Sequence, residues 1–535
     1  MTGRTVLIGL DGATFTILDP LMQRGVLPFL QRFAASGVRA TLHSVIPPLT
    51  PPAWTSLVTG RSPGLHGVFD FFLRDSADSQ HIRFATSQDV DAETIWSVAD
   101  RHGLRTTVLN FPLMFPPPQI SGYVVPGWMP WRQLRLGCHP PNLYDRLKAL
   151  SGFNARELAM DMELEEKAIE GCQPDEYVEW IEFYTRREQQ WLRVLRALML
   201  EEPCQLTAVL FDGMDKLQHL CWRFLEPARP DESMSPKART IRQLVLEYYR
   251  QLDRALCEIV SLAGPDATVV LASDHGFGPQ NTTFFINTWL QQHGYLAWAD
   301  GQAPLASDTK SVGIGQLARH IHLLDWERTT AYVPTPSGNG IHIVVAGQGS
   351  EHGVAPAEYE RFRSQLAQEL RDFTAPASGE RVVSEIWFRE DAFAGPSMEL
   401  APDLTVLLAD GGQVSILASD EPFKLRPEVR GAHRLEGVFI ADGPALRTGE
   451  QLAPLSILDM APLLLHSLGL PIPDDMEGRV PTEALEPAAL LAQPVRTVSQ
   501  PGAAATPPQT WSGPVMDEED EAEMLRRLRA LGYVQ

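Results

Sequence analysis

Three short apolar runs, each followed within two residues by an aspartate, constrain the fold of this chain more than any other feature. They cover residues 5–10, 206–211 and 267–272. Such runs are typical of strands in a parallel sheet that is covered on both faces. The third run leads into Asp274 and His275, and open α/β sheets bind their ligands at the carboxyl ends of their strands. We therefore predict an α/β protein with a ligand site at that edge of a mostly parallel sheet.

The residues at these strand ends favour a divalent metal. Asp274 and His275 offer a carboxylate oxygen and an imidazole nitrogen, which suit an ion such as zinc. Asp215 and His219 are four residues apart, so on a helix they would share one face and could bind one metal. Asp11 follows the first strand, where it could equally belong to a turn. Each pair alone has a plain alternative as loop or surface residues, and the hypothesis of a metal site depends on their combination.

Thr50 is a hydroxyl residue held between two proline pairs, Pro47-Pro48 and Pro51-Pro52. Proline fixes its own φ and restricts the residue before it, which predicts a stiff turn at the start of the following helix. The free N–H groups of a helix N-terminus can meet an anion. The hydroxyl could be an N-cap, or a nucleophile if a metal lowers its pKa.

Together these segments resemble the type I phosphodiesterase/nucleotide pyrophosphatase branch of the alkaline phosphatase superfamily. The resemblance is carried by Asp11 after the first strand, Thr50 ahead of Val58-Thr59-Gly60, Pro63-x-x-His66-Gly67, Asp215-x-x-x-His219, Asp274-His275 and Gly431-x-His433. It implies an alkaline phosphatase-like α/β/α sandwich with an inserted cap subdomain.

The resemblance also implies a two-metal hydrolase. One divalent ion takes Asp11, Asp274, His275 and the Thr50 oxygen, and the other takes Asp215, His219 and His433. Zn²⁺ is the expected ion, with Mn²⁺ as the alternative. Two ions about 4 Å apart can stabilise the attacking and leaving oxygens of an in-line displacement. The expected reaction is hydrolysis of a phosphodiester or pyrophosphate bond through a phosphothreonine at Thr50.

One departure from the family concerns substrate binding. The eukaryotic-type members carry an asparagine shortly beyond the nucleophile that holds a phosphate oxygen, but no asparagine lies between Thr50 and Asn110 in this chain. Asn110 could substitute for it or could cap a turn. Lys216, Arg434 and Arg61 lie beside the motifs and could contact substrate, although charged residues are more often solvated.

Other functions stay open at this point. They are phosphomonoester hydrolysis, phosphoryl transfer by the same type of centre, and a non-catalytic metal-binding or scaffold role. The sequence around Thr50 does not fit the Cys/Ser-x-Pro/Ala-x-Arg frame of sulfatases. The insertion lacks the basic cluster expected of a cofactor-independent phosphoglycerate mutase.

The composition of the chain limits the kinds of molecule and environment that it is expected to meet. The chain of 535 residues carries a formal net charge of −22, which argues against a nucleic-acid polymer but not against a small phosphate ester. The five cysteines (138, 172, 204, 221 and 257) lack CxxC spacing and are expected to be ordinary thiols. No stretch reaches the roughly 18 apolar residues of a membrane span, and the N-terminus lacks a signal-peptide pattern. We expect a cytoplasmic protein, and a homodimer is one option for its assembly.

The expected organisation has four parts. Residues 1–300 and 430–485 form the catalytic core, and 301–429 form the cap. Residues 486–515, rich in Ala, Pro and Gln, form a linker. Residues 516–535 form an acidic tail with a short amphipathic helix.

Overall fold

A nine-stranded mixed sheet forms the centre of the computed structural model, which describes residues 3–499 except 75, 77–81, 160–163, 165–171, 173–174, 226–233, 301–319, 336–338, 349–350, 377 and 410. The strand order is β17 (Glu450–Gln451), β2 (Val38–His43), β16 (Glu436–Asp442), β8 (Thr268–Ala272), β1 (Thr5–Leu10), β7 (Leu206–Phe211), β5 (Thr106–Leu109) and β6 (Gly122–Val125), with β18 (Leu455–Ser456) also beside β2. Every pair is parallel except the two pairs made by β16. The predicted α/β fold with a mostly parallel sheet is confirmed.

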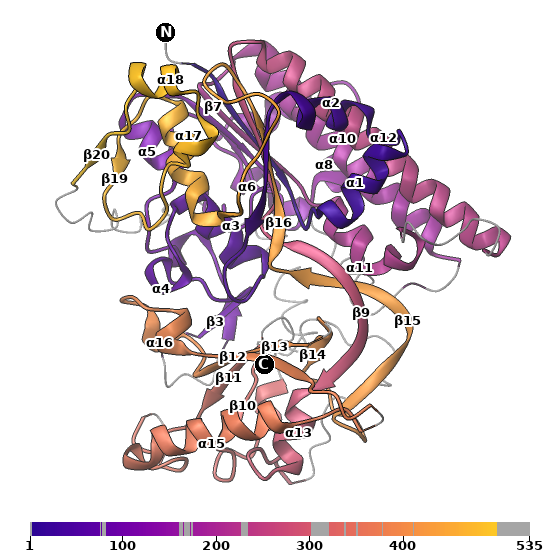
Figure 1. Cartoon of the computed structure of the whole chain (residues 1–535), viewed down its shortest axis with the longest axis vertical. Coiled ribbons are helices and arrows are strands. Elements are labelled where there is room, and N and C mark those ends of the chain that lie inside the picture. Colours follow the sequence, from indigo (N-terminus) through magenta and orange to yellow (C-terminus); the bar gives the residue numbers. More distant parts are fainter. Residues whose placement is uncertain are drawn as a thin grey trace.

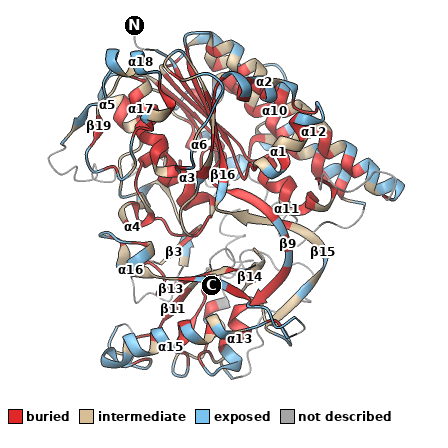
Figure 2. Ribbon diagram, in the orientation of Figure 1, coloured by how far each residue is buried: buried red, intermediate tan, exposed pale blue. Residues whose placement is uncertain are grey.

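Helices cover both faces of this sheet (Figure 1). One face carries α1 (Phe15–Gln23), α2 (Pro28–Ser36), α10 (Tyr177–Glu201), α11 (Gly213–Leu225) and α12 (Pro236–Ala263), and the other carries α3 (Thr50–Thr59), α5 (Ile95–Arg101) and α17 (Met460–Ser467). Side chains of β1 alternate between the two layers, since Ile8 and Leu10 join the first and Leu7 joins the second. Figure 2 shows the resulting buried sheet between partly exposed helices.

Close packing holds α3 against the central strand. A Cβ on Gly9 of β1 would lie 2.7 Å from the ring of Trp54, which is buried on α3. Trp54 also packs edge-on against Phe111, with ring centroids 5.4 Å apart. The absence of a side chain at Gly9 therefore lets α3 approach β1 closely.

A long antiparallel ribbon leaves the core directly after His275. It consists of β9 (Gly276–Phe285) and β15 (Phe423–Arg434), with a register shift between Leu425 and Arg430. The ribbon carries what we call the distal unit, the described residues of 286–422 (Figure 1). That unit contains α13 (Ile286–Gln292), α15 (Tyr359–Asp372), β14 (Gln413–Ser415) beside β9, and a four-stranded sheet in the order β10 (Ala331–Tyr332), β11 (Gly340–Ile343), β13 (Leu404–Leu408) and β12 (Val383–Phe388).

A second contact joins the distal unit to the core beside α4 (Pro63–His66) and α16 (Arg389–Ala392). Phe69 packs edge-on against Phe393 with ring centroids 5.2 Å apart, and the Ser397 N–H donates to the Gly64 carbonyl at 3.1 Å. A core hairpin, β3 (Phe72–Arg74) and β4 (Ile82–Phe84), follows α4. The distal unit is thus held at two separate places.

The remaining described elements are short. Helices α6 (Leu134–Gly137), α7 (Leu143–Lys148) and α8 (Ala155–Leu158) follow β6, and α18 (Pro487–Ala492) precedes β20 (Thr497–Val498), which pairs with β19 (Ile472–Pro473). The described start of the expected linker therefore carries a helix and a strand. The described residues end at 499, so the rest of the expected linker and the acidic tail lie outside them. Residues 336–338 of the insertion also lie outside the described residues. None of the described helices combines the length and the apolar character of a membrane span.

Candidate metal centre

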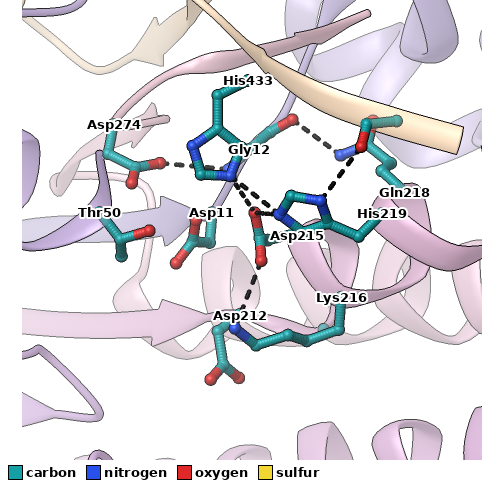
Figure 3. Close-up of polar contacts among 12 residues, drawn as sticks. Asp11, Gly12, Thr50, Asp212, Asp215, Lys216, Gln218, His219, Asp274 and His433 are labelled. Carbon is teal, nitrogen blue, oxygen red and sulfur yellow. Dashed lines mark hydrogen bonds and ion pairs between the residues drawn. The ribbon is translucent and has the colours of Figure 1, made fainter. Parts of the chain in front are cut away.

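The candidate ligands arrive from four segments at the carboxyl edge of the central sheet. Asp11 follows β1, Asp274 and His275 follow β8, Asp215 and His219 lie on α11 after β7, and His433 lies near the end of β15. Figure 3 shows Asp11, Thr50, Asp215, His219, Asp274 and His433 around one point. The structure brings together all the ligand positions that the sequence nominates.

A first cluster surrounds His275. Its Nε2 lies 3.2 Å from an Asp274 oxygen, 3.7 Å from an Asp11 oxygen and 3.5 Å from the hydroxyl of Thr50. All four side chains are buried. Asp11, Asp274 and His275 form a triad whose ligand atoms lie within 4.8 Å of one another.

A second cluster adjoins the first. Asp215 Oδ1 lies 3.1 Å from His433 Nε2 and 3.4 Å from His219 Nε2, and these two nitrogens are 3.0 Å apart. Asp215, His275 and His433 form another triad within 4.8 Å, and the rings of His275 and His433 stack with centroids 3.7 Å apart. The two candidate triads are consistent with a centre for two metal ions.

Backbone carbonyls set the tautomers of the three histidines. The Nδ1–H of His219 donates to Gly431 at 3.1 Å, that of His433 to Pro48 at 2.8 Å, and that of His275 to Gly276 at 3.1 Å. Because a carbonyl only accepts, each Nδ1 carries a proton, and Nε2 is the nitrogen whose lone pair can bind a cation at the centre. Two such acceptors 3.0 Å apart require a cation or a proton between them, and burial lowers the pKa of His219.

The carboxylates fit a bound cation as well. Both oxygens of Asp11 and Oδ2 of Asp274 are buried and have no hydrogen-bond donor among the described residues. Burial, and then the charges of Asp274 and Asp215, raise the pKa of Asp11 well above its usual value. Burial and Asp215 raise the pKa of Asp274 in the same way. Buried anionic oxygens need a positive partner, and this oxygen and imidazole set suits Zn²⁺ or Mn²⁺.

Asp215 has a cation beside it in the protein itself. Lys216 Nζ lies 3.3 Å from Asp215 Oδ2 and 5.0 Å from the centre of the Trp128 ring. Burial acts to raise the pKa of Asp215, but its interactions with His219, Lys216 and His433 bring it well below the usual value. Asp215 is therefore held ionised. Lys216 lies at the edge of the centre, next to the motif that made it a candidate substrate contact.

Thr50 is the first residue of α3, as predicted, but the helix supplies fewer donors than expected. The next two residues are prolines without N–H groups, and the Ala53 N–H already donates to Leu49 at 3.0 Å. Only the amide of Thr50 itself is left to meet an anion. Pro51 and Pro52 therefore remove two of the N–H groups that the start of a helix otherwise offers to an anion.

The other nominated substrate contacts are engaged within the protein. Asn110 donates to the Leu210 carbonyl at 2.8 Å, and its side chain is buried at the end of β5. Arg434 donates to several backbone carbonyls around the base of the ribbon. Arg61 forms an ion pair with Asp475 at 2.5 Å. A role of Asn110 or Arg434 in substrate binding stays a prediction.

Several residues that position the ligands carried no signal in the sequence. Gln218 donates to the Gly12 carbonyl at 2.8 Å, and the Gly12 N–H donates to Asp274 at 3.1 Å. Phe277 packs edge-on against His219 and His433, with ring centroids 4.8 and 5.2 Å away. A glutamine and a phenylalanine beside a motif are common anywhere, so only the structure identifies these contacts.

A buried ion pair supports the end of β7 behind the centre. Arg187 on α10 contacts Asp212 at 3.1 Å, and both side chains are buried. We expect Arg187→Met to lower the free energy of unfolding by about 3–5 kcal/mol, because it leaves a buried carboxylate unpaired. Urea unfolding would measure this. Arg196→Met, which breaks a largely exposed pair with Glu258 on the same helix, should cost at most about 1 kcal/mol. Equal losses in the two variants would contradict the prediction.

The chain is similar to a known protein family and to several solved structures. A family model described as type I phosphodiesterase/nucleotide pyrophosphatase matches residues 5–434, a range that includes every candidate ligand. The crystal structure of phosphonoacetate hydrolase from Sinorhizobium meliloti 1021 in complex with phosphonoformate has a TM-score of 0.51 and 16% identity, covering 87% of this chain and 95% of that chain. Human ectonucleotide pyrophosphatase/phosphodiesterase 5 has a TM-score of 0.49 and 14% identity, with coverages of 87% and 95%.

Proposed function

This chain belongs to the type I phosphodiesterase/nucleotide pyrophosphatase family, and from that membership we propose that it hydrolyses phosphodiester or pyrophosphate bonds with two divalent metal ions. The observation that carries the proposal is the position of the Thr50 hydroxyl, 3.5 Å from His275 Nε2, in the cluster that contains the carboxylate oxygens without a hydrogen-bond donor. The Thr50 hydroxyl, a possible nucleophile, thus lies beside buried carboxylate oxygens that need a cation.

Each cluster would hold one ion. Asp11, Asp274, His275 and the Thr50 oxygen would bind the first, and Asp215, His219 and His433 would bind the second. His275 belongs to both triads, and its 3.2 Å distance to Asp274 supports its assignment to the first cluster. When bound, the ions stabilise negative charge on the attacking and leaving oxygens of an in-line displacement.

Thr50 would act as the nucleophile. Its Oγ1 attacks phosphorus, the bond to the leaving oxygen breaks, and a phosphothreonine forms. Attack by water on that phosphorus then releases the phosphate product and restores the hydroxyl. The prolines around Thr50 limit its backbone to one conformation, so the hydroxyl is oriented before substrate arrives.

Lys216 would supply positive charge from the protein. Because Pro51 and Pro52 leave α3 with a single available N–H, the helix N-terminus can donate only one hydrogen bond to phosphate oxygens. Lys216 is held near the centre by Asp215 and Trp128, and its charge opposes the rise that burial and the neighbouring aspartates cause in the pKa of Asp11. We assign it to a phosphate oxygen or to the leaving group.

Paired chromogenic esters test this function. Chelator-treated protein would be assayed with p-nitrophenyl phosphate and bis-p-nitrophenyl phosphate, before and after addition of Zn²⁺ or Mn²⁺. We expect turnover to depend on added metal and to favour the diester. Faster turnover of the monoester would instead make the protein a phosphatase. Tight metal binding without turnover of either ester would favour a non-catalytic role.

A further inference from the structure

A pocket of about 250 Å³ lies between the core and the distal unit. On the core side it is lined by Pro47 and by residues from Gly67 to Asp91, which include the β3–β4 hairpin. On the other side it is lined by residues of β11 and β13 and their flanking loops. None of the candidate metal ligands lines it.

Two buried polar side chains of the distal sheet line this pocket without a partner. They are Nδ1 of His342 on β11 and the hydroxyl of Thr405 on β13, and neither has a hydrogen-bond partner among the described residues. Thr405 pairs with Gly340, two residues before His342, so both side chains belong to the same face of the sheet. Buried polar groups are nearly always paired in folded proteins, and these two point to a ligand that pairs them.

The charges around the pocket indicate the kind of ligand. The lining includes Arg74 and Arg83 and three aspartates, namely Asp70, Asp89 and Asp91, so negative charges outnumber positive ones. Burial, followed by the charges of Arg74 and Arg389, lowers the pKa of His342 well below its usual value. His342 is therefore neutral. A phosphate or carboxylate would find no surplus of positive charge in this pocket.

The two unpaired groups, the Thr405 hydroxyl and the neutral His342 ring, can each donate or accept a hydrogen bond and carry no charge. A threonine hydroxyl both donates and accepts, and a neutral imidazole nitrogen does either according to its tautomer. Hydroxyl groups of a ligand have the same double capacity. Apolar side chains in the lining, among them Phe72, Leu73 and Pro402, can cover the C–H faces between such hydroxyls. This combination suits a sugar ring or a comparable polyol.

The pocket also lies close to the nucleophile along the chain. Pro47 in its lining precedes Thr50 by three residues, and successive Cα atoms are about 3.8 Å apart, so the two Cα atoms are within roughly 11 Å. The next residue, Pro48, accepts the hydrogen bond from His433 at 2.8 Å. This distance is short enough for one end of an ester held at the metal centre to reach the pocket.

We propose that this pocket binds a hydroxyl-rich group, a sugar or similar polyol, of the ester whose phosphate is cleaved at the metal centre. The proposal rests on the proposed function and adds a substrate class to it. His342 and Thr405 determine specificity by pairing ligand hydroxyls, and the distal unit thereby selects the substrate while the core carries the chemistry.

Two diesters with the same leaving group separate this proposal from the proposed function. Metal-loaded full-length protein would be given glucose 6-(p-nitrophenyl phosphate) and cyclohexylmethyl p-nitrophenyl phosphate, which differ in the hydroxyls and the ring oxygen of a six-membered ring. We expect kcat/KM to favour the glucose ester about tenfold or more, because burying unpaired polar groups against cyclohexyl is unfavourable. The isosteric variant Thr405→Val should lower kcat/KM for the glucose ester about tenfold and leave the cyclohexylmethyl ester within about twofold.

A second variant and a matched control complete the test. His342→Phe should also remove the preference, whereas Thr374→Val, at an exposed position of the distal unit, should change neither value. Retained turnover of the cyclohexylmethyl ester shows that a variant is folded. A preference unaffected by both pocket variants, or no preference in the wild type, would overturn this inference alone. No turnover of either ester by the wild type would overturn the proposed function together with it.

Discussion

Thr50→Ala is expected to lower kcat for bis-p-nitrophenyl phosphate about a thousandfold or more, since removal of a nucleophile leaves only the contribution of binding and electrostatics. Metal content should stay at about two ions per chain, because Asp11, Asp274 and His275 remain in the first cluster. Steady-state kinetics and metal analysis on the same sample would measure both quantities.

Two variants of the same helix serve as controls for this experiment. Thr59→Ala removes a hydroxyl that donates to the Thr55 carbonyl at 2.7 Å, away from the centre, and should retain near wild-type kcat. Thr50→Ser keeps an oxygen at the critical position and should be intermediate. Full metal-dependent turnover by Thr50→Ala would show that the reaction proceeds without a phosphothreonine.

Asp274→Asn is expected to produce a similarly large loss of activity for a different reason. The change removes an anionic oxygen that lies 3.2 Å from His275 Nε2 and has no other partner among the described residues. We expect the affinity for one of the two ions to fall by at least about 100-fold, by analogy with losses of 10–100-fold for groups that only support ligands. Isothermal titration with Zn²⁺ would resolve the weakened site.

Although Asp274→Asn should lose activity, we do not expect it to lose stability to thermal unfolding in the metal-free state. Because burial and Asp215 raise the pKa of Asp274, its ionised form destabilises the metal-free protein at pH values above the usual carboxyl pKa. Metal-free Asp274→Asn should therefore be as stable as metal-free wild type or more stable, while added Zn²⁺ should stabilise the wild type more. Asp266→Asn, an exposed position just before β8, should match the wild type in both states. A destabilised metal-free variant would contradict this account.

The central sheet and most of the centre could be predicted from the sequence because both follow from local patterns. Apolar runs mark β1, β7 and β8, and since these strands are parallel neighbours, the residues after them must meet at one edge. His433 is different. It reaches the centre through the ribbon from a distant part of the chain, and only its likeness to a family motif singled it out.

What the sequence did not reveal depends on backbone atoms and on contacts between distant segments. The carbonyls of Pro48 and Gly431 set histidine tautomers, yet a carbonyl has no sequence signature. Arg61 and Arg434 looked available beside the motifs, but their partners come from far along the chain or from the backbone. The pocket that contains His342 forms only when the distal unit meets the core, so no stretch of sequence displays it.

Because of the ribbon, metal ions at the centre would join the two ends of the chain segment that forms the distal unit, and removal of the ions would release that link. His275 directly precedes β9 and His433 lies at the end of β15, so ions held there would tie together both ends of the intervening chain. The entropy of closing a loop grows slowly with its length, by about 0.6 kcal/mol per doubling. The segment between the two histidines can therefore be lengthened, shortened or replaced at little energetic cost, provided that its ends return to the ions. If the proposals above hold, related proteins could change their substrate preference by altering this segment, while all the metal-binding residues stay the same.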